Sequence, residues 1–220
     1  MKPIFLAALC AFSMPALAQV AKTSARPALH PRLAVGADGY STGDLVKNLD
    51  VVRGNIHDLL NYLETAPAPA ADEAAQAQKQ MIAESEACAV LIAESDRALR
   101  EGIPRGTKIP AGAVSMRKAE AVLGDRSVRM LQRESAADRA SVAQEMQALI
   151  ELKARVLPHD AETAQRALRE EADAEALLKS RRALLTVSDR RLARALDTQA
   201  RKDVGAAGQK ALKAVAVTGF

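Results

Sequence analysis

The sequence is almost without aromatic residues. It contains no tryptophan, two tyrosines and three phenylalanines among 220 residues, an aromatic share of 2%. A compact globular enzyme of this size would usually build its core on several large rings. Alanine and leucine carry most of the apolar content instead, and runs of β-branched residues are scarce. This composition predicts an all-α fold in which long helices pack through small side chains.

Cysteine and histidine are too few, and too scattered, to form a metal site. The cysteines are Cys10 and Cys88, and the histidines are His30, His57 and His159. No pair has the spacing of metal ligands, and an HExxH motif is missing, so the sequence predicts no metal and no cofactor. Cys88 lies in the apolar run ACAVLIA, which favours a small buried side chain. An intermolecular disulfide between two copies is the alternative.

Motifs of nucleophilic catalysis and phosphate binding are also missing. There is no G-x-S-x-G elbow, and S-x-x-K occurs only as Ser115 to Lys118, at a predicted helix start where a capping serine explains it. The loop GIPRGTKIPAG follows no strand and lacks the G-K-[ST] order of a phosphate-binding loop. We therefore expect no catalytic residues, and a protein that is not an enzyme.

The first 18 residues have the three parts of a secretory signal peptide. Lys2 gives a short positive region, residues 4–12 form an apolar run, and Ala16-Leu17-Ala18 is a small-x-small cleavage pattern. The run is too short to cross a membrane as a mature helix. We predict cleavage between Ala18 and Gln19, and a periplasmic or secreted protein.

Charge gives little indication of the partner. The net charge of +4 is small, and acidic and basic residues are interspersed along the chain. Nucleic-acid-binding domains usually carry a concentrated basic surface. Together with the predicted export, this argues against a nucleic-acid partner.

The most regular stretch of the chain is Ser41 to Thr65. Apolar residues recur there at alternating steps of four and three: Leu45, Leu49, Val52, Ile56, Leu59 and Leu63. That spacing predicts a helix packed along another helix, in the same chain or in a second copy. Ser41 and Asp44 are placed to form a capping box. Most polar residues of the stretch, Asn48 and Asn55 among them, are expected on its other faces.

Prolines and glycines divide the rest of the chain. We expect an extended or disordered lead-in at 19–40 and a helical bundle domain at 41–204. Its predicted helices are 42–65, 72–100, 113–157 and 160–204. The third has a candidate break at Gly124-Asp125, and Asp160 caps the last. The second helix should pack on the first as a hairpin, and the last two should form a longer antiparallel hairpin. Gly205 and Gly208 interrupt the pattern, so 205–220 is predicted to be a flexible tail.

The last predicted helix has an asymmetric charge distribution. Acidic residues dominate from Glu162 to Glu175, and basic residues from Lys179 to Lys202. Complementarity to the helix dipole accounts for part of this pattern. The functional hypothesis is a basic docking surface for an acidic protein or for anionic lipid headgroups. Its candidate residues are Arg181, Arg182, Arg190, Arg191, Arg194, Arg201 and Lys202.

In layout, an exported helical chain of this size and low aromatic content resembles the minor pilus subunits of type IV secretion and conjugation machines. Those pair a long helical bundle with a smaller helical appendage. The resemblance carries over no residues. It implies a structural subunit or adaptor of a bacterial envelope assembly, with protein partners that include a second copy as one candidate. A periplasmic chaperone for unfolded clients is the alternative class, and an enzyme of unknown type is the third.

Overall fold

The computed structural model describes residues 25–33, 39–66, 71–107 and 123–218, with side chains through residue 209. Four helices account for most of them: α1 (Thr42–Thr65), α2 (Ala71–Glu101), α3 (Arg126–Ala154) and α4 (Ala161–Thr218). No β-strand occurs in these ranges. The expected all-α helical bundle is confirmed. The predicted signal peptide lies outside the described residues.

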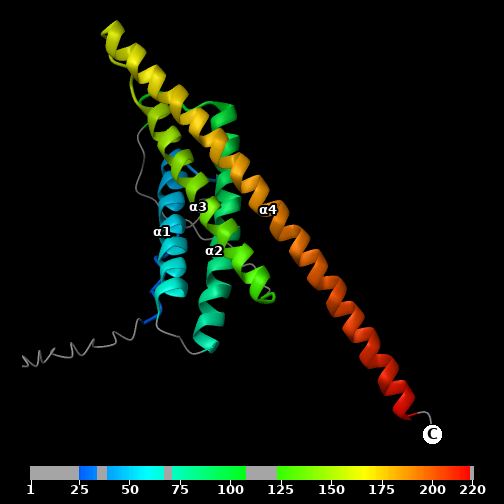
Figure 1. Cartoon of the computed structure of the whole chain (residues 1–220). Helices are drawn as coiled ribbons and strands as arrows, with labels where there is room; N and C mark the ends of the chain where they lie inside the picture. Colours follow the sequence, from blue (N-terminus) through cyan, green and yellow to red (C-terminus); the bar gives the residue numbers. More distant parts are fainter. Residues whose placement is uncertain (1–24, 34–38, 67–70, 108–122, 219–220) are drawn as a thin grey trace, which may run out of the picture.

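Helices α1, α2 and α3 lie side by side, and each packs against the other two (Figure 1). Of the other three helices, only α3 packs closely against α4. Helix α4 crosses α3 and continues past its end. At 1.5 Å per residue, the 58 residues of α4 extend for about 87 Å. The molecule is therefore a three-helix bundle with one long helix attached to its side.

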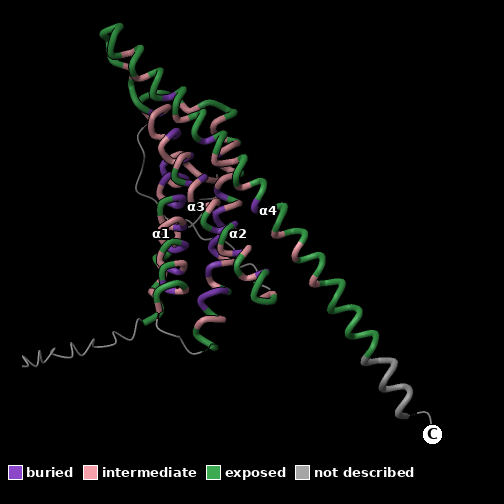
Figure 2. Tube along the Cα trace, viewed as in Figure 1, coloured by how far each residue is buried: buried purple, intermediate pink, exposed green. Residues whose placement is uncertain are grey.

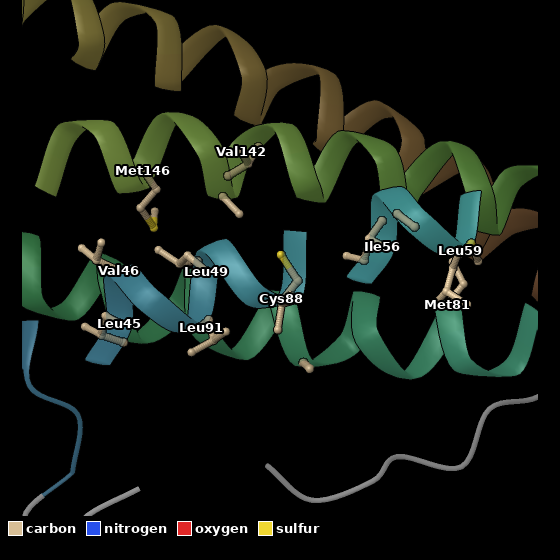
Figure 3. Close-up of a cluster of buried hydrophobic side chains, with 14 of the residues drawn as sticks. Leu45, Val46, Leu49, Ile56, Leu59, Met81, Cys88, Leu91, Val142 and Met146 are labelled. Atoms are coloured by element: carbon tan, nitrogen blue, oxygen red, sulfur yellow. The ribbon is translucent and has the colours of Figure 1, made fainter. Parts of the chain in front are cut away.

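The core of the bundle is built on the regular row of α1. Leu45, Leu49, Val52, Ile56 and Leu59 are at most 1% exposed, and Leu63 is partly buried. Met81, Cys88 and Leu91 of α2 and Val142 and Met146 of α3 complete the cluster (Figure 3). The α1 row thus lies inside its own chain. Between the apolar residues of α2, the small Ser85 and Ser95 are buried as well.

Local signals in the sequence explain how several helices begin and end. Ser41 and Asp44 form the predicted capping box at the start of α1. The Asp160 carboxylate accepts the backbone N–H of Thr163 at 2.8 Å in the first turn of α4, as predicted. Gly102, just after α2, has a φ of +89°, a left-handed conformation that glycine adopts at helix ends without a Cβ penalty.

The start of α3 and the end of α4 bear on the predicted boundaries. Helix α3 begins at Arg126, directly after the candidate break at Gly124-Asp125, because the Asp125 side chain accepts the Val128 N–H and caps the helix there; residues 113–122 of the predicted helix lie outside the described ranges. Helix α4 continues through Gly205 and Gly208 to Thr218, so the expectation of a flexible tail from 205 is wrong over this range. Each glycine costs a helix only about 1 kcal/mol, and the surrounding alanine, lysine, glutamine and leucine are good helix formers.

Part of the lead-in, for which an extended or disordered chain was predicted, is docked on the bundle. Residues 25–33, called here the docked segment, contain no helix, and their Leu29 packs against the core. The His30 N–H donates to Asn55 Oδ1 at 2.8 Å, and Asn55 Nδ2 donates to the His30 carbonyl at 3.1 Å. The Leu33 N–H donates to Asn48 Oδ1 at 3.0 Å. Two asparagines of α1 therefore form hydrogen bonds with the backbone of a segment that has no secondary structure of its own.

These asparagines correct the expected polar face of α1. Asn48 and Asn55 are at most 1% exposed rather than on a solvated face. Asn55 Nδ2 also contacts Glu84 Oε2 at 3.2 Å, and Glu84 Oε1 forms an ion pair with Arg32 at 3.2 Å. A buried amide needs such partners. Helix α1 is surrounded by α2, α3 and the docked segment, so its buried face is wider than the apolar row.

Candidate functional site

Helix α4 is the candidate for a functional element, because most of its described residues are exposed rather than part of the core. It contacts α3 through a row at steps of four and three in which Leu178, Leu185 and Leu192 recur every seven residues. Leu178 and Ser188 of this row are 4% and 3% exposed, and Leu185 and Leu192 are partly buried. This seven-residue repeat is thus the row that attaches α4 to α3.

Polar contacts strengthen this attachment. Arg139 of α3 forms an ion pair with Asp189 of α4 at 3.0 Å and donates to Ser85 Oγ of α2 at 3.1 Å. The Ser135 hydroxyl donates to Asp189 at 2.6 Å, and the Ser188 hydroxyl donates to Asp138. Because one arginine joins three helices, the middle of α4 is held in a defined position on the bundle.

Several residues of the predicted basic surface are paired within the chain. Arg182 forms an ion pair with Asp96 of α2, and Arg191 pairs with Glu134 of α3 at 2.5 Å. Two further pairs are Arg181–Glu145 at 3.9 Å and Arg201–Asp197 at 2.9 Å. These side chains retain 39–80% exposure. The pairs of Arg181, Arg182 and Arg191 bridge two helices, whereas the Arg201 pair lies within α4. Their ion pairs reduce the positive charge that they offer to a partner.

The other three candidates are exposed and unpaired. Arg190, Arg194 and Lys202 make no ion pair with the described part of the chain, and all three are exposed. Within the described residues, the seven predicted basic residues therefore divide into four that form ion pairs and three that form none. The hydrogen bond from Ser127 lowers the pKa of the Asp125 carboxyl, and Lys202 lies close enough to this carboxyl to help lower it further.

Large apolar side chains are also exposed along α4, and Figure 2 shows that most of the described part of this helix is exposed. The exposed fractions are 46% for Leu168, 44% for Leu177, 51% for Leu184, 54% for Val187 and 74% for Val204. Beyond Gln199, whose side chain accepts the Asp125 N–H at 3.1 Å, residues 200–209 are all exposed. Leu177, Leu184 and Val187 share one side of the helix, and exposed apolar side chains gathered on one surface are typical of contacts with other proteins.

Hollows on the surface lie between helices. One, of about 330 Å³, lies between α2, α3 and α4 and includes Ser85, Arg139 and Leu192. In this hollow, the arginine and the serine already bond to protein groups. Another, of about 440 Å³, lies between α1 and α3, where Ile56 and Ala140 line it together with the polar His57.

The groups most often used in catalysis are dispersed. His30, His57 and His159 are exposed on three different elements, and within the described ranges no three His, Cys, Asp or Glu side chains gather where they could hold a metal ion. Cys88 is fully buried, and burial raises the pKa of its thiol to about 12. Such a thiol is neither a nucleophile at neutral pH nor placed for a disulfide between folded copies.

Comparison of the chain with protein-family models, with curated proteins and with solved structures found no match. None of the helices in the described ranges is long and apolar enough to cross a membrane.

Sequence reasoning did not find the docked segment or its two asparagines. Asn48 and Asn55 are seven residues apart beside the apolar row, a spacing that places them on one face of the helix. This regular spacing was the sequence signal that could have indicated a second buried row on α1. The sequence could not show which segment covers them.

Proposed function

We propose that this chain is a non-enzymatic exported protein that acts by binding, as a structural subunit or adaptor of a bacterial envelope assembly. The observation that supports this proposal most strongly is α4. It is longer than the other helices, it is attached along one side, and it keeps exposed apolar and basic residues over much of its length. A helix that extends beyond its own core contributes little to that core and is well suited to reach another molecule.

Minor pilus subunits of type IV secretion and conjugation machines are the specific class that this layout favours. The three-helix bundle with one attached long helix agrees with their combination of a long bundle and a smaller part. Residues 1–18 predict export to the compartment in which such machines assemble. The partners would be envelope proteins. Arg190, Arg194 and Lys202 could also meet anionic lipid headgroups.

A photo-crosslinking amino acid at position 204 tests this proposal in cells. Val204 is 74% exposed on the part of α4 that extends beyond the bundle. We expect crosslinks to one or a few defined envelope proteins. The matched control is position 90, where Val90 is 50% exposed on α2. Equal crosslinking from both positions, or none from position 204, would contradict a partner-binding role for α4.

A periplasmic chaperone is the second candidate, because the exposed leucines and valines of α4 could hold unfolded clients. This class makes a different prediction: the purified chain should suppress aggregation of an unrelated unfolded protein at near-stoichiometric amounts. An assembly subunit should leave that aggregation unchanged and should co-purify with specific partners. The two measurements separate the two functions.

A further inference from the structure

A second row of residues runs along α4, beside the row that faces α3. Its centre is Leu177, Ser180, Leu184 and Val187, at steps of three, four and three. The three apolar members are 44–54% exposed, and α4 is mostly exposed over this stretch in Figure 2. Each leucine comes one position before a leucine of the α3-facing row, so it points about 100° away around the helix. We call this second row the outer row.

The outer row continues at the same spacing into charged residues of opposite sign. Glu170 and Asp173 precede its apolar centre, and Arg191 and Arg194 follow it. Glu170, Asp173 and Arg194 are exposed and form no ion pair with the described residues. Arg191 pairs with Glu134 but remains 56% exposed. The outer row is therefore acidic at one end, apolar in the middle and basic at the other end.

A row with this order is complementary to itself when it is reversed. Suppose that a second copy is related to the first by a two-fold axis through the middle of the outer row. Each residue on one side of the middle then lies opposite the residue of the second copy that is equally far from the middle on the other side. Glu170 then faces Arg194 of the second copy, and Asp173 faces Arg191, with both contacts made twice by symmetry. A parallel pair would instead place acid on acid and base on base, which opposes association.

The apolar centre fits the same reversal. Leu177 then lies opposite Val187 of the second copy, and Ser180 lies opposite Leu184. The steps of three and four are those of two helices packed along each other. Ala176 and Ala183, which flank the row and are exposed, are small enough to let the helices approach closely.

We infer that two copies of this chain associate through the outer rows of their α4 helices, as an antiparallel pair with two-fold symmetry. The apolar centre supplies the burial, and the four charge contacts fix the orientation and the register. The buried row of α1 takes no part. The dimer does not depend on the envelope role proposed above, because it needs only this chain.

The first test is the mass of the purified protein across a concentration series, by sedimentation or light scattering. We expect a shift with concentration from the mass of one chain to twice that mass, and no further. Leu184→Asp should abolish the shift. Leu168→Asp is the matched control, because Leu168 is exposed to a similar extent (46%) on another side of the same helix, and it should leave the shift unchanged. Circular dichroism should show that both variants keep the helical fold.

Charge reversal tests the antiparallel orientation. Glu170→Arg and Arg194→Glu should each weaken the dimer at least tenfold in Kd, because each places like charges in two contacts. The double variant should dimerise again, and a mixture of the two single variants should form the mixed dimer. In a parallel pair, the wild type, each single variant and the double variant would all place like charges opposite each other at both positions, so neither the loss nor the rescue by the double variant would appear. High salt should reduce the differences in Kd between the wild type and the charge variants, because it screens the charges.

Several results would overturn the inference. One is a monomer at every concentration up to about 1 mM, a range that reports all but the weakest association. Another is a dimer that survives Leu184→Asp while the fold is intact. Failure of the double variant to restore a dimer lost in both single variants would overturn the antiparallel register. None of these results bears on the crosslinking from position 204, so the two proposals can fail separately.

Discussion

Asn55→Ala should release the docked segment while leaving the helices folded. Asn55 makes two hydrogen bonds with the backbone of His30 and one with Glu84. At a net of about 1 kcal/mol each, the two bonds to His30 contribute ~2 kcal/mol to holding the segment. Opening of the segment should therefore become about 30-fold more frequent, since a 1.4 kcal/mol change is a factor of 10 in an equilibrium constant.

Native-state hydrogen exchange followed by NMR measures this effect residue by residue. The His30 amide should exchange roughly 30-fold faster in the variant, in conditions where exchange reports the opening equilibrium. The Leu33 amide, which Asn48 holds, is a second reporter of the same segment. Amides in the middle of α2 and α3 should change less, because they are exposed only by larger unfolding events.

The matched control is Asn61→Ala. Asn61 is an exposed asparagine of α1 whose side chain lies near that of His57, and it should have no effect on the His30 amide. If His30 exchanged at the same rate in Asn55→Ala as in the wild type, the buried amide would not be holding the segment, and the role given to it here would be wrong.

Three further predictions follow from buried groups. Cys88 should not react with a thiol reagent at pH 8 in the folded chain and should react fully after denaturation, because burial raises its pKa to about 12; fast reaction in the folded state would contradict its place in the core. Burial raises the pKa of Glu84, partly opposed by Arg32, so the folded chain binds this proton more tightly than the unfolded chain. The free energy of unfolding should therefore fall as the pH rises above the carboxyl's ordinary value of 4.5, and Glu84→Gln should remove that part of the pH dependence in urea titrations. Leu49→Ala, at a fully buried site, should lower the free energy of unfolding by about 3 kcal/mol, whereas Val90→Ala, at a half-exposed site on α2, should change it by less than about 0.5 kcal/mol.

Much of the fold follows from local patterns in the sequence. The row from Leu45 to Leu59 predicts α1 and its buried face, and Ser41 and Asp160 mark helix starts because each supplies an acceptor to free N–H groups. The length of α4 was harder to predict from the sequence. Gly205 and Gly208 resemble an end, but their small penalties are outweighed by their neighbours.

The surfaces were harder to predict than the helices. That Arg182 pairs with Asp96, 86 residues earlier in the chain, depends on where α4 crosses the bundle. The same holds for Asn48 and Asn55, which look like surface residues until the docked segment covers them. Periodicity within one helix shows which residues share a face. It does not show what that face meets.

The one-sided attachment of α4 has a mechanical consequence. Among the residues whose side chains the structure describes, Gln199 makes the last hydrogen bond from α4 to the bundle, with Asp125. At 1.5 Å per residue, the helix continues for about 28 Å beyond it, to Thr218. Over that length, a tilt of about 10° at the α3 contact displaces the tip by about 5 Å, a full helical turn. The bundle and the free end of α4 thus form a fulcrum and a lever. A force applied to the tip therefore exerts a torque at the α3–α4 contact, and this torque is proportional to the projecting length.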